Sequence, residues 1–378
     1  MTVPTVDRVR QALATVDDPE IHRPITELGM VDTVEISPDG KVRVGILLTI
    51  QGCPLRDKLQ GDITLAIAKL DDVTGVTVDF GVMSDGQRKT LQSELMGDRS
   101  TRVIPFSNPL SRTKIYAVAS GKGGVGKSSL TVNLAVATAR LGRSVGIVDA
   151  DIYGHSIPRM LGVTEKPTQV GEMVMPPTAH GVRVISTGMF TSGNNPMVWR
   201  GPMLHRALEQ FLAEVYWGDL DVLFLDLPPG TGDIALSISQ LLPSAEILVV
   251  TTPQQAAAEV AERAGSMVTQ TEQHIAGVIE NMAWLSCPHC DERIDVFGSG
   301  GGRKVADALS RIVGAPVPLL GQIPLDVRLR EHGDSGDPIV LADPDSPAAQ
   351  VILEIVDKLS VRGRSLVGRL LGLTPLRR

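Results

Sequence analysis

The chain has 378 residues, of which 43% are hydrophobic and 21% charged, an ordinary composition for a globular protein with a buried core. The formal net charge of −7 argues against a protein that binds nucleic acid through a basic face. Three cysteines are too few for a disulfide scaffold, and no apolar run is long enough to span a membrane. Because the first residues also lack the apolar stretch of a signal peptide, we expect a cytoplasmic protein.

Residues 1–95 predict a small α+β domain. The segment Ser37-Pro38-Asp39-Gly40 separates two strand-like stretches and predicts a hairpin turn between them. The elements that we expect are, in chain order, a helix at 5–15, strands at 31–36 and 41–50, a helix at 55–70 and a strand at 75–82.

Residues 84–112 are polar, show little periodicity and contain two prolines, so they predict a linker, with the domain boundaries placed to leave 96–112 between the domains. Beyond the linker, aliphatic strands alternate with amphipathic helices over 113–358. This alternation predicts an α/β domain with a mostly parallel sheet flanked by helices. The predicted strands are 114–119, 144–149, 182–187, 220–226, 245–251, 275–280 and 317–321, and a basic tail follows at 359–378.

A glycine-rich segment matches the phosphate-binding pattern G-x-x-x-x-G-K-[ST], between a predicted strand and a predicted helix. Glycines allow backbone N–H groups to point at phosphate oxygens, and the helix N-terminus adds partial positive charge. We expect Lys127 to reach the β- and γ-phosphates of ATP and the Ser128 hydroxyl to bind Mg²⁺. The loop consists of Gly121, Lys122, Gly123, Gly124, Val125, Gly126, Lys127, Ser128 and Ser129.

Acidic residues follow two predicted strands, at the edge where ligands bind in open α/β sheets. One strand ends in Asp149-Ala150-Asp151, and another ends in Asp226, which is the Walker B pattern. We predict that Asp226 holds the Mg²⁺ shell and that Asp149 acts on it through water. The glycine-rich residues 228–233 then predict a switch that moves with the γ-phosphate.

Two cysteines, Cys287 and Cys290, lie three positions apart in a predicted loop. Thiolates at this spacing can bind one metal centre, and soft thiolates suit an iron–sulfur cluster or Zn²⁺ better than Mg²⁺. A redox pair is a third interpretation, although such pairs begin a helix in a different fold. One pair cannot complete a site of four ligands. His289, between them, is expected to face solvent.

The second lysine of the loop, Lys122, resembles the deviant Walker A lysine of the ATPase group that includes MinD, ParA, ArsA and the nitrogenase iron protein. The resemblance implies that Lys122 crosses a dimer interface to the partner's ATP, so the chain would be a nucleotide-dependent homodimer. It also implies a catalytic role for Lys122, Lys127 and Asp151, with Asp151 acting on the attacking water. Asn281 and Pro324 would lie at the adenine and select ATP.

A more specific resemblance covers 113–358, where GKGGVGKSS, VDADIYGHS, WRGPM, DLPPGTGD, ENMAWLSCPHC and VFGSGGGRKVA occur in the order typical of Mrp/ApbC-type iron–sulfur cluster carrier ATPases. It implies that two copies of Cys287 and Cys290 bind a cluster, [4Fe–4S], at the dimer interface. The cluster would come from a donor and pass to apo-proteins. His155 departs from the pattern, since many members have proline there. The first domain resembles iron–sulfur maintenance proteins at Asp18-Pro19-Glu20, Leu28-Gly29-Met30-Val31 and Gly52-Cys53-Pro54.

The main alternative is a MinD- or ParA-like ATPase for spatial organisation on a membrane or nucleoid, which would not need the cysteine pair. A zinc-stapled regulatory NTPase is another. Cys53 either passes on a cluster or iron, or is a small buried hydrophobe. The tail mixes leucines with arginines, as a membrane-surface helix does, but three glycines interrupt it, so we expect a frayed tail without membrane contact.

Overall fold

The structure is a computed structural model, and two features singled out in the sequence, Cys53 and the tail beyond residue 361, lie outside the residues that it describes. No helix in the described part of the chain is long and apolar enough to cross a bilayer. The described residues are 3–49, 56–96, 103–108, 110–151, 154–190, 201–230, 233–254, 264–265, 268, 271, 273–287, 289–290 and 292–361.

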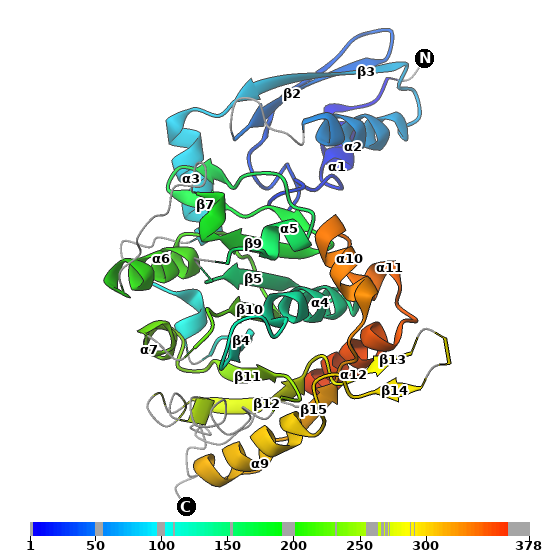
Figure 1. Cartoon of the computed structure of the whole chain (residues 1–378). Coiled ribbons are helices and arrows are strands. Elements are labelled where there is room, and N and C mark those ends of the chain that lie inside the picture. Colours follow the sequence, from blue (N-terminus) through cyan, green and yellow to red (C-terminus); the bar gives the residue numbers. More distant parts are fainter. Residues whose placement is uncertain are drawn as a thin grey trace, which may run out of the picture.

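The N-terminal domain is a three-stranded sheet against which two helices pack (Figure 1). Strand β2 alternates between buried residues such as Val44 and Ile46 and exposed or half-buried ones, because successive side chains point to opposite faces of a sheet. Gly40 adopts φ 80° in the turn between β1 and β2, which confirms the predicted hairpin. The elements are α1 (Val6–Leu13), β1 (Val31–Ile36), β2 (Lys41–Leu48), α2 (Arg56–Ala68) and β3 (Gly75–Val82).

The predicted linker was wrong in its first part, because residues Asp85–Met96 form helix α3. Leu91 of this helix is buried in the core of the N-terminal domain, and Leu95 packs partly against the same core. Two such contacts leave too weak a periodicity to predict a helix from sequence. A short 3₁₀ turn, Pro105–Ser107, follows and buries Phe106 against the second domain.

The second domain is built on an eight-stranded sheet in the order β15-β12-β11-β4-β10-β5-β9-β8. Its first seven strands run parallel, and the short β8 (Thr178–Ala179) pairs antiparallel with β9 at the edge. The parallel strands, all predicted within two residues at each end, are β4 (Lys114–Ser120), β5 (Val145–Asp149), β9 (Val182–Ser186), β10 (Val222–Asp226), β11 (Glu246–Thr251), β12 (His274–Glu280) and β15 (Leu319–Gln322).

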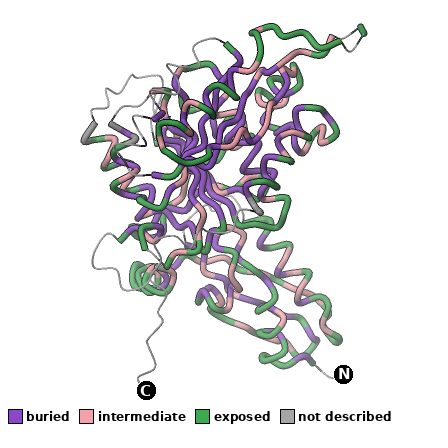
Figure 2. The backbone as a smooth tube through the Cα atoms, turned by 90° about the horizontal axis from the view of Figure 1, so that it is seen from below, coloured by how far each residue is buried: buried purple, intermediate pink, exposed green. Residues whose placement is uncertain are grey.

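Helices cover both faces of this sheet, so the strands are buried on both sides, as Figure 2 shows for the centre of the molecule. One core contains side chains from α6 (Gly201–Ala213), α7 (Asp233–Leu241) and α9 (Gly301–Val313). The opposite core is lined by α4 (Lys127–Arg140), α5 (Ile157–Met160), α10 (Val327–Ser335), α11 (Ile339–Ala342) and α12 (Pro347–Val361). The predicted α/β fold with helices on both faces is confirmed.

The apolar core of the N-terminal domain extends into the second domain. The hairpin of β6 (Thr168–Val170) and β7 (Met173–Met175) belongs to the second domain, yet its buried Val170 and Met173 join the core of the first. Tyr216 does the same, and Gln92 of α3 accepts a hydrogen bond from the backbone N–H of Glu172 in the hairpin turn. The sequence did not predict this hairpin.

Candidate functional site

Three adjacent strands bring the predicted phosphate loop and both acidic segments to one edge of the sheet. Strand β10 lies between β4 and β5, and its last residue, Asp226, is in register with Val118 and with Asp149. The loop that leaves β4 turns into α4 through Gly124 (φ 76°) and Gly126 (φ 79°), conformations that glycine adopts without steric cost. The carboxyl ends of these strands therefore surround the N-terminus of α4.

Asp226 is the centre of this arrangement and is completely buried. Its Oδ2 lies 2.7 Å from Lys127 Nζ and accepts a hydrogen bond of 2.6 Å from Ser128 Oγ. Thr131, one turn further along α4, donates to Oδ1 at 2.8 Å. The lysine expected at phosphate and the hydroxyl expected at Mg²⁺ are thus held together by the Walker B carboxylate.

Asp149 forms the second buried carboxylate beside it. Burial, and then the neighbouring charge of Asp226, raise the pKa of Asp149 to about 8. Ser186 at the end of β9 donates to Asp149 Oδ2 at 3.0 Å, and the Asp151 N–H donates to Oδ1 at 3.2 Å. Two buried carboxylates that repel each other and stand beside a hydroxyl form a hard oxygen site of the kind that suits Mg²⁺, which would relieve the repulsion.

Two segments follow the ends of β5 and β10, and we call residues 149–156 the first switch and residues 228–233 the second switch. Asp151 is half-buried, and its carboxylate accepts a hydrogen bond of 3.1 Å from Gly154 N–H. Gly230, in the second switch, donates from its backbone to the Ser120 carbonyl at 2.9 Å. Lys122 donates a hydrogen bond to Gln254 Oε1, so the lysine of the deviant motif is held within its own protomer.

Asn281 follows β12 and contacts the phosphate loop directly. Its Nδ2 donates to the Val125 carbonyl at 2.9 Å, while its buried Oδ1 has no hydrogen-bond partner among the described residues. A Cβ at Gly126 would lie 2.3 Å from Nδ2, so this approach requires glycine. Ile323, next to Pro324, donates its N–H to the Glu280 carbonyl at 2.8 Å. The two segments expected at the adenine therefore lie side by side, and one carries an unused acceptor.

The cysteine pair lies on a small hairpin of β13 (Leu285–Ser286) and β14 (Arg293–Ile294), which Figure 1 shows projecting from the body. Cys287 is half-buried and donates its N–H to the Glu292 carbonyl at 2.9 Å, while Cys290 is exposed. His289 is exposed, as expected. Among the described residues there is no group of three or more histidine, cysteine or acidic side chains placed to hold a metal ion.

Three polar residues of the site were not predicted. Thr131 stands four positions after Lys127 on the same helix face, and Ser186 ends the strand beside β5, so helical spacing and strand order were the available signals. Gln254, after β11, comes from a segment whose sequence showed no recognised motif.

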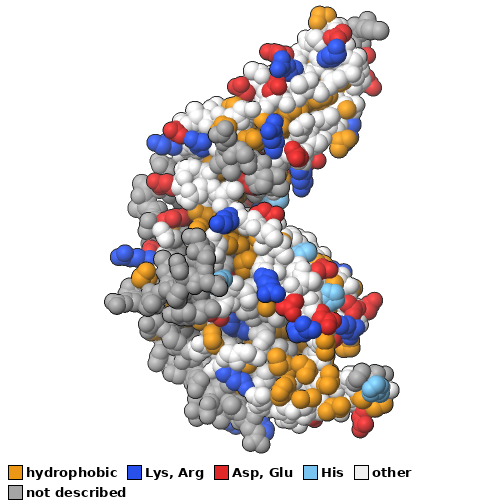
Figure 3. Space-filling view, turned by 45° about the horizontal axis from the view of Figure 1, so that its top comes forward, with side chains coloured by type: hydrophobic (Ala, Val, Ile, Leu, Met, Phe, Trp, Pro, Cys, Tyr) orange, Lys and Arg blue, Asp and Glu red, His pale blue; other side chains and the backbone are white. Residues whose placement is uncertain are grey.

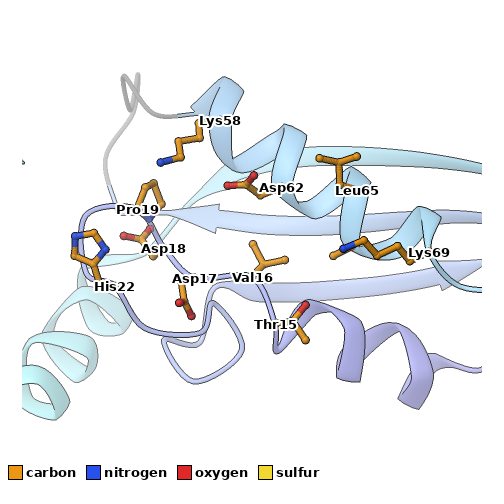
Figure 4. Close-up of a pocket in the computed structure, with 11 residues that line it drawn as sticks. Thr15, Val16, Asp17, Asp18, Pro19, His22, Lys58, Asp62, Leu65 and Lys69 are labelled. Atoms are coloured by element: carbon orange, nitrogen blue, oxygen red, sulfur yellow. The ribbon is translucent and has the colours of Figure 1, made fainter. Parts of the chain in front are cut away.

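The N-terminal domain contains a separate pocket of about 360 Å³ between the loop after α1 and helix α2 (Figure 4). Its charged lining combines acids with bases: Asp17, Asp18, Asp62, His22, Lys58 and Lys69. Asp18 uses its carboxylate within its own loop, since Oδ1 accepts from the N–H groups of Glu20 and Ile21 at 2.9 and 2.8 Å. The Asp18-Pro19-Glu20 segment therefore builds a turn beside the domain junction.

Comparison with known proteins gives consistent matches to both domains. Residues 111–360 match the family model described as NUBPL iron-transfer P-loop NTPase, and residues 6–79 match the iron–sulfur cluster assembly protein model. The chain is 60% identical to the iron–sulfur cluster carrier protein of Mycobacterium tuberculosis, over 98% of this chain and 97% of that protein. It is 40% identical to the protein of the same name from Bacillus subtilis, over 94% and 97%.

A solved structure adds a nucleotide to the comparison. The nucleotide-binding protein of Archaeoglobus fulgidus, in complex with ADP, is 34% identical, with a TM-score of 0.52 over 67% of this chain and 91% of that one.

Proposed function

The chain belongs to the NUBPL iron-transfer family of P-loop NTPases, and we propose that it is an ATP-hydrolysing carrier of iron–sulfur clusters. The observation that carries the proposal is that the thiols of Cys287 and Cys290 lie on a projecting hairpin, six positions after a residue that touches the phosphate loop. One chain thus combines a nucleotide site with an accessible pair of soft ligands.

Each buried polar group of the proposed nucleotide site has a role in binding or hydrolysis. With ATP and Mg²⁺ bound, Lys127 would pair with phosphate oxygens in place of Asp226, and the Ser128 hydroxyl would be a ligand of the ion. Asp226 and Asp149 hold the hydrated shell of that ion. Asn281 offers its unpartnered Oδ1 to the amino group of adenine, and Asp151 orients the attacking water.

The dimer half of the proposal concerns Lys122. Gln254 accepts a hydrogen bond from this lysine, and closure of a homodimer would transfer the lysine to the partner's ATP. Beside the projecting hairpin, Figure 3 shows hydrophobic side chains gathered on the lower right of the visible face. Ile294 on β14, Val296 just after it and Val327 at the start of α10 are each more than 40% exposed, and exposed apolar side chains of this kind support an interface with a second copy.

The cluster is the cargo of this reaction. A single protomer contributes two thiolates, and two copies would supply the four that a [4Fe–4S] cluster takes. Cys290 is exposed and the hairpin projects, so an apo-protein could approach the cargo directly. If ATP binds one dimer geometry more tightly than another, and the cluster also distinguishes the two, ATP changes the affinity for the cluster. The cluster then changes the affinity for ATP by the same factor.

A transfer assay tests the proposal. The chain is loaded anaerobically with iron and sulfide, and transfer to a cluster-free ferredoxin is followed by absorbance with and without Mg·ATP. We expect transfer by the wild type and none above the protein-free rate by Cys287→Ala or Cys290→Ala, and Cys53→Ala, measured beside them, reports whether Cys53 passes on a cluster. Uptake and transfer that survive both substitutions would exclude these ligands.

The alternative of a MinD- or ParA-like spatial organiser predicts a different result from the same protein. Such an ATPase would bind vesicles of anionic lipid or DNA in an ATP-dependent manner, and alanine at both cysteines would leave that binding intact.

A further inference from the structure

The segment from Asn281 to Ser286, which we call the strap, connects the phosphate loop to the first cysteine. At one end, the Asn281 side chain is hydrogen-bonded to the Val125 carbonyl, and its N–H donates to Thr251 at 2.8 Å. At the other end, Cys287 follows directly in sequence. Both reactive parts of the proposed carrier are therefore joined by six residues.

The strap is fixed along its length, so it can transmit a displacement. Ala283 donates its N–H to the Ile323 carbonyl at 2.9 Å, and the Trp284 carbonyl accepts from Leu325 N–H at 2.6 Å. The Arg293 guanidinium stacks 4.5 Å from the centre of the Trp284 ring, which ties β14 to the strap. The backbone hydrogen bond from Cys287 to Glu292 then closes the hairpin.

One residue of the strap has an unusual backbone. Met282 adopts φ 55°, in the left-handed region that methionine rarely occupies and that glycine or asparagine adopt more easily. Its side chain reaches the phosphate loop, since its methyl group would lie 3.9 Å from a Cβ at Gly126. Strained backbone of this kind persists where the surrounding contacts determine it on both sides.

The second switch has different neighbours. Its backbone bonds run from Leu227 to Val118 and from Gly230 to Ser120, both on β4. The strap, in contrast, contacts the phosphate loop through Asn281 and continues directly into the hairpin of Cys287.

We propose that the strap couples nucleotide binding to the cysteine pair, with Asn281 as the positioning residue that senses the loop and Met282 as the stiff pivot. The coupling rests on the proposed function for its biological purpose and for the nucleotide that binds at Asn281. Adenine bound at the Asn281 amide sets the position of the first residue of the strap. Because hydrogen bonds hold the rest of the strap, a displacement of this residue changes the position and accessibility of Cys287.

The test measures thiol reactivity in the full chain without a cluster. The alkylation rate of Cys287 by iodoacetamide is followed by peptide mass spectrometry, without nucleotide and with Mg²⁺ and a non-hydrolysable ATP analogue at a concentration saturating for each variant. Met282→Gly frees the pivot, whereas Met282→Asn also removes the thioether but keeps a side chain suited to the left-handed backbone. Asp72→Gly, at φ 73° in the N-terminal domain, is the matched control for gaining glycine.

We expect nucleotide to change the rate for Cys287 by at least about fivefold in the wild type, in Met282→Asn and in Asp72→Gly, and by less than about twofold in Met282→Gly. An undiminished effect in Met282→Gly would overturn the proposal, since it would assign the change to dimer closure alone, and so would a wild type without any effect. Failure of the transfer assay with an intact nucleotide effect here would refute the carrier function while leaving the strap in place.

Discussion

Lys127 Nζ lies 2.7 Å from Asp226 Oδ2, and both side chains are almost fully removed from solvent. The pair satisfies two charges that would otherwise be buried alone, at the place where the proposed function requires phosphate and Mg²⁺. In the proposed function, binding of Mg·ATP would exchange this charge pair for pairs of Lys127 with phosphate and of Asp226 with the ion.

Lys127→Met removes the cation from this pair. We expect the free energy of unfolding to fall by about 3 kcal/mol, because Asp226 then remains buried without its partner, and ATP hydrolysis to fall at least about 100-fold. Urea unfolding and a phosphate-release assay measure the two effects. Lys122→Met is the control, since that lysine is paired with a neutral amide, and we expect its stability to change by less than about 0.5 kcal/mol. Equal stabilities for the two variants would contradict the assignment of Lys127 as the cation that stabilises buried Asp226.

Gly126→Ala and Gly142→Ala form a matched pair, because both glycines have positive φ, 79° and 74°. A Cβ at Gly142 meets nothing within 4 Å, so that variant should lose about 1 kcal/mol of stability from backbone strain alone and bind nucleotide normally. At Gly126 the Cβ would displace the Asn281 amide, and nucleotide affinity should fall at least about tenfold. Calorimetric titration with ADP separates them; equal affinities would show that Asn281 need not approach the loop.

In the proposed dimer, we expect the hydrogen bond with Gln254 to set how readily Lys122 leaves its own chain. Gln254→Ala should release the lysine and strengthen dimerisation with a non-hydrolysable ATP analogue, and Gln254→Glu should hold it by charge and weaken dimerisation, each by about three- to tenfold. Analytical ultracentrifugation with and without nucleotide gives the dimer constants. If both substitutions shift the constant in the same direction, Gln254 does not act by holding Lys122.

Glu20 makes the domain junction sensitive to pH. Burial, and then the charge of Asp18, raise the pKa of Glu20 to about 7, while a hydrogen bond with Thr168 opposes the shift. The folded state therefore favours the neutral acid: this stabilisation is complete below about pH 4.5, the ordinary value for glutamate, and is lost as pH rises through about 7. His22 and Asp18 lie on the same loop, and Arg183 and Tyr216 face it from the second domain.

Glu20→Gln keeps a neutral side chain at every pH, so it should raise the melting temperature relative to the wild type at pH 8 and much less at pH 5. Thr168→Val removes the bond that favours the carboxylate, so it should increase the loss of stability between these pH values. Thermal unfolding of the full chain at both pH values checks this. A difference for Glu20→Gln that is constant with pH would contradict a junction controlled by this carboxyl.

Local patterns determined most of what could be predicted. The buried strands of the second domain are runs of branched aliphatics, and each glycine-rich or acidic segment follows a strand end, so β4, β10 and their site residues were recognisable. Helix α3 was not predicted because its apolar contacts come from Leu91 and Leu95, which are too few to give a helical pattern of apolar residues. The β6–β7 hairpin was not predicted because its Met173 is buried in the other domain. Such a long-range contact leaves no periodic pattern in the local sequence.

Within the site, the sequence did not predict the side chains whose role is to hydrogen-bond another side chain of the site. Thr131 and Ser186 look like ordinary helix and strand residues until Asp226 and Asp149 are placed beside them. The contact of Lys122 with Gln254 joins positions 132 apart in sequence. The strap was visible as a short spacing between Asn281 and Cys287, but its backbone hydrogen bonds to β11 and to the segment after β15 require the fold.

The central claim is that two chains share one cluster through four thiolates, and native mass spectrometry of the anaerobically reconstituted protein tests it most directly. We predict a dimer that carries the mass of one [4Fe–4S] cluster, and dimers or monomers without added mass for the variant with Cys287→Ala and Cys290→Ala. A cluster of the same mass on monomers, or on the double variant, would contradict the account.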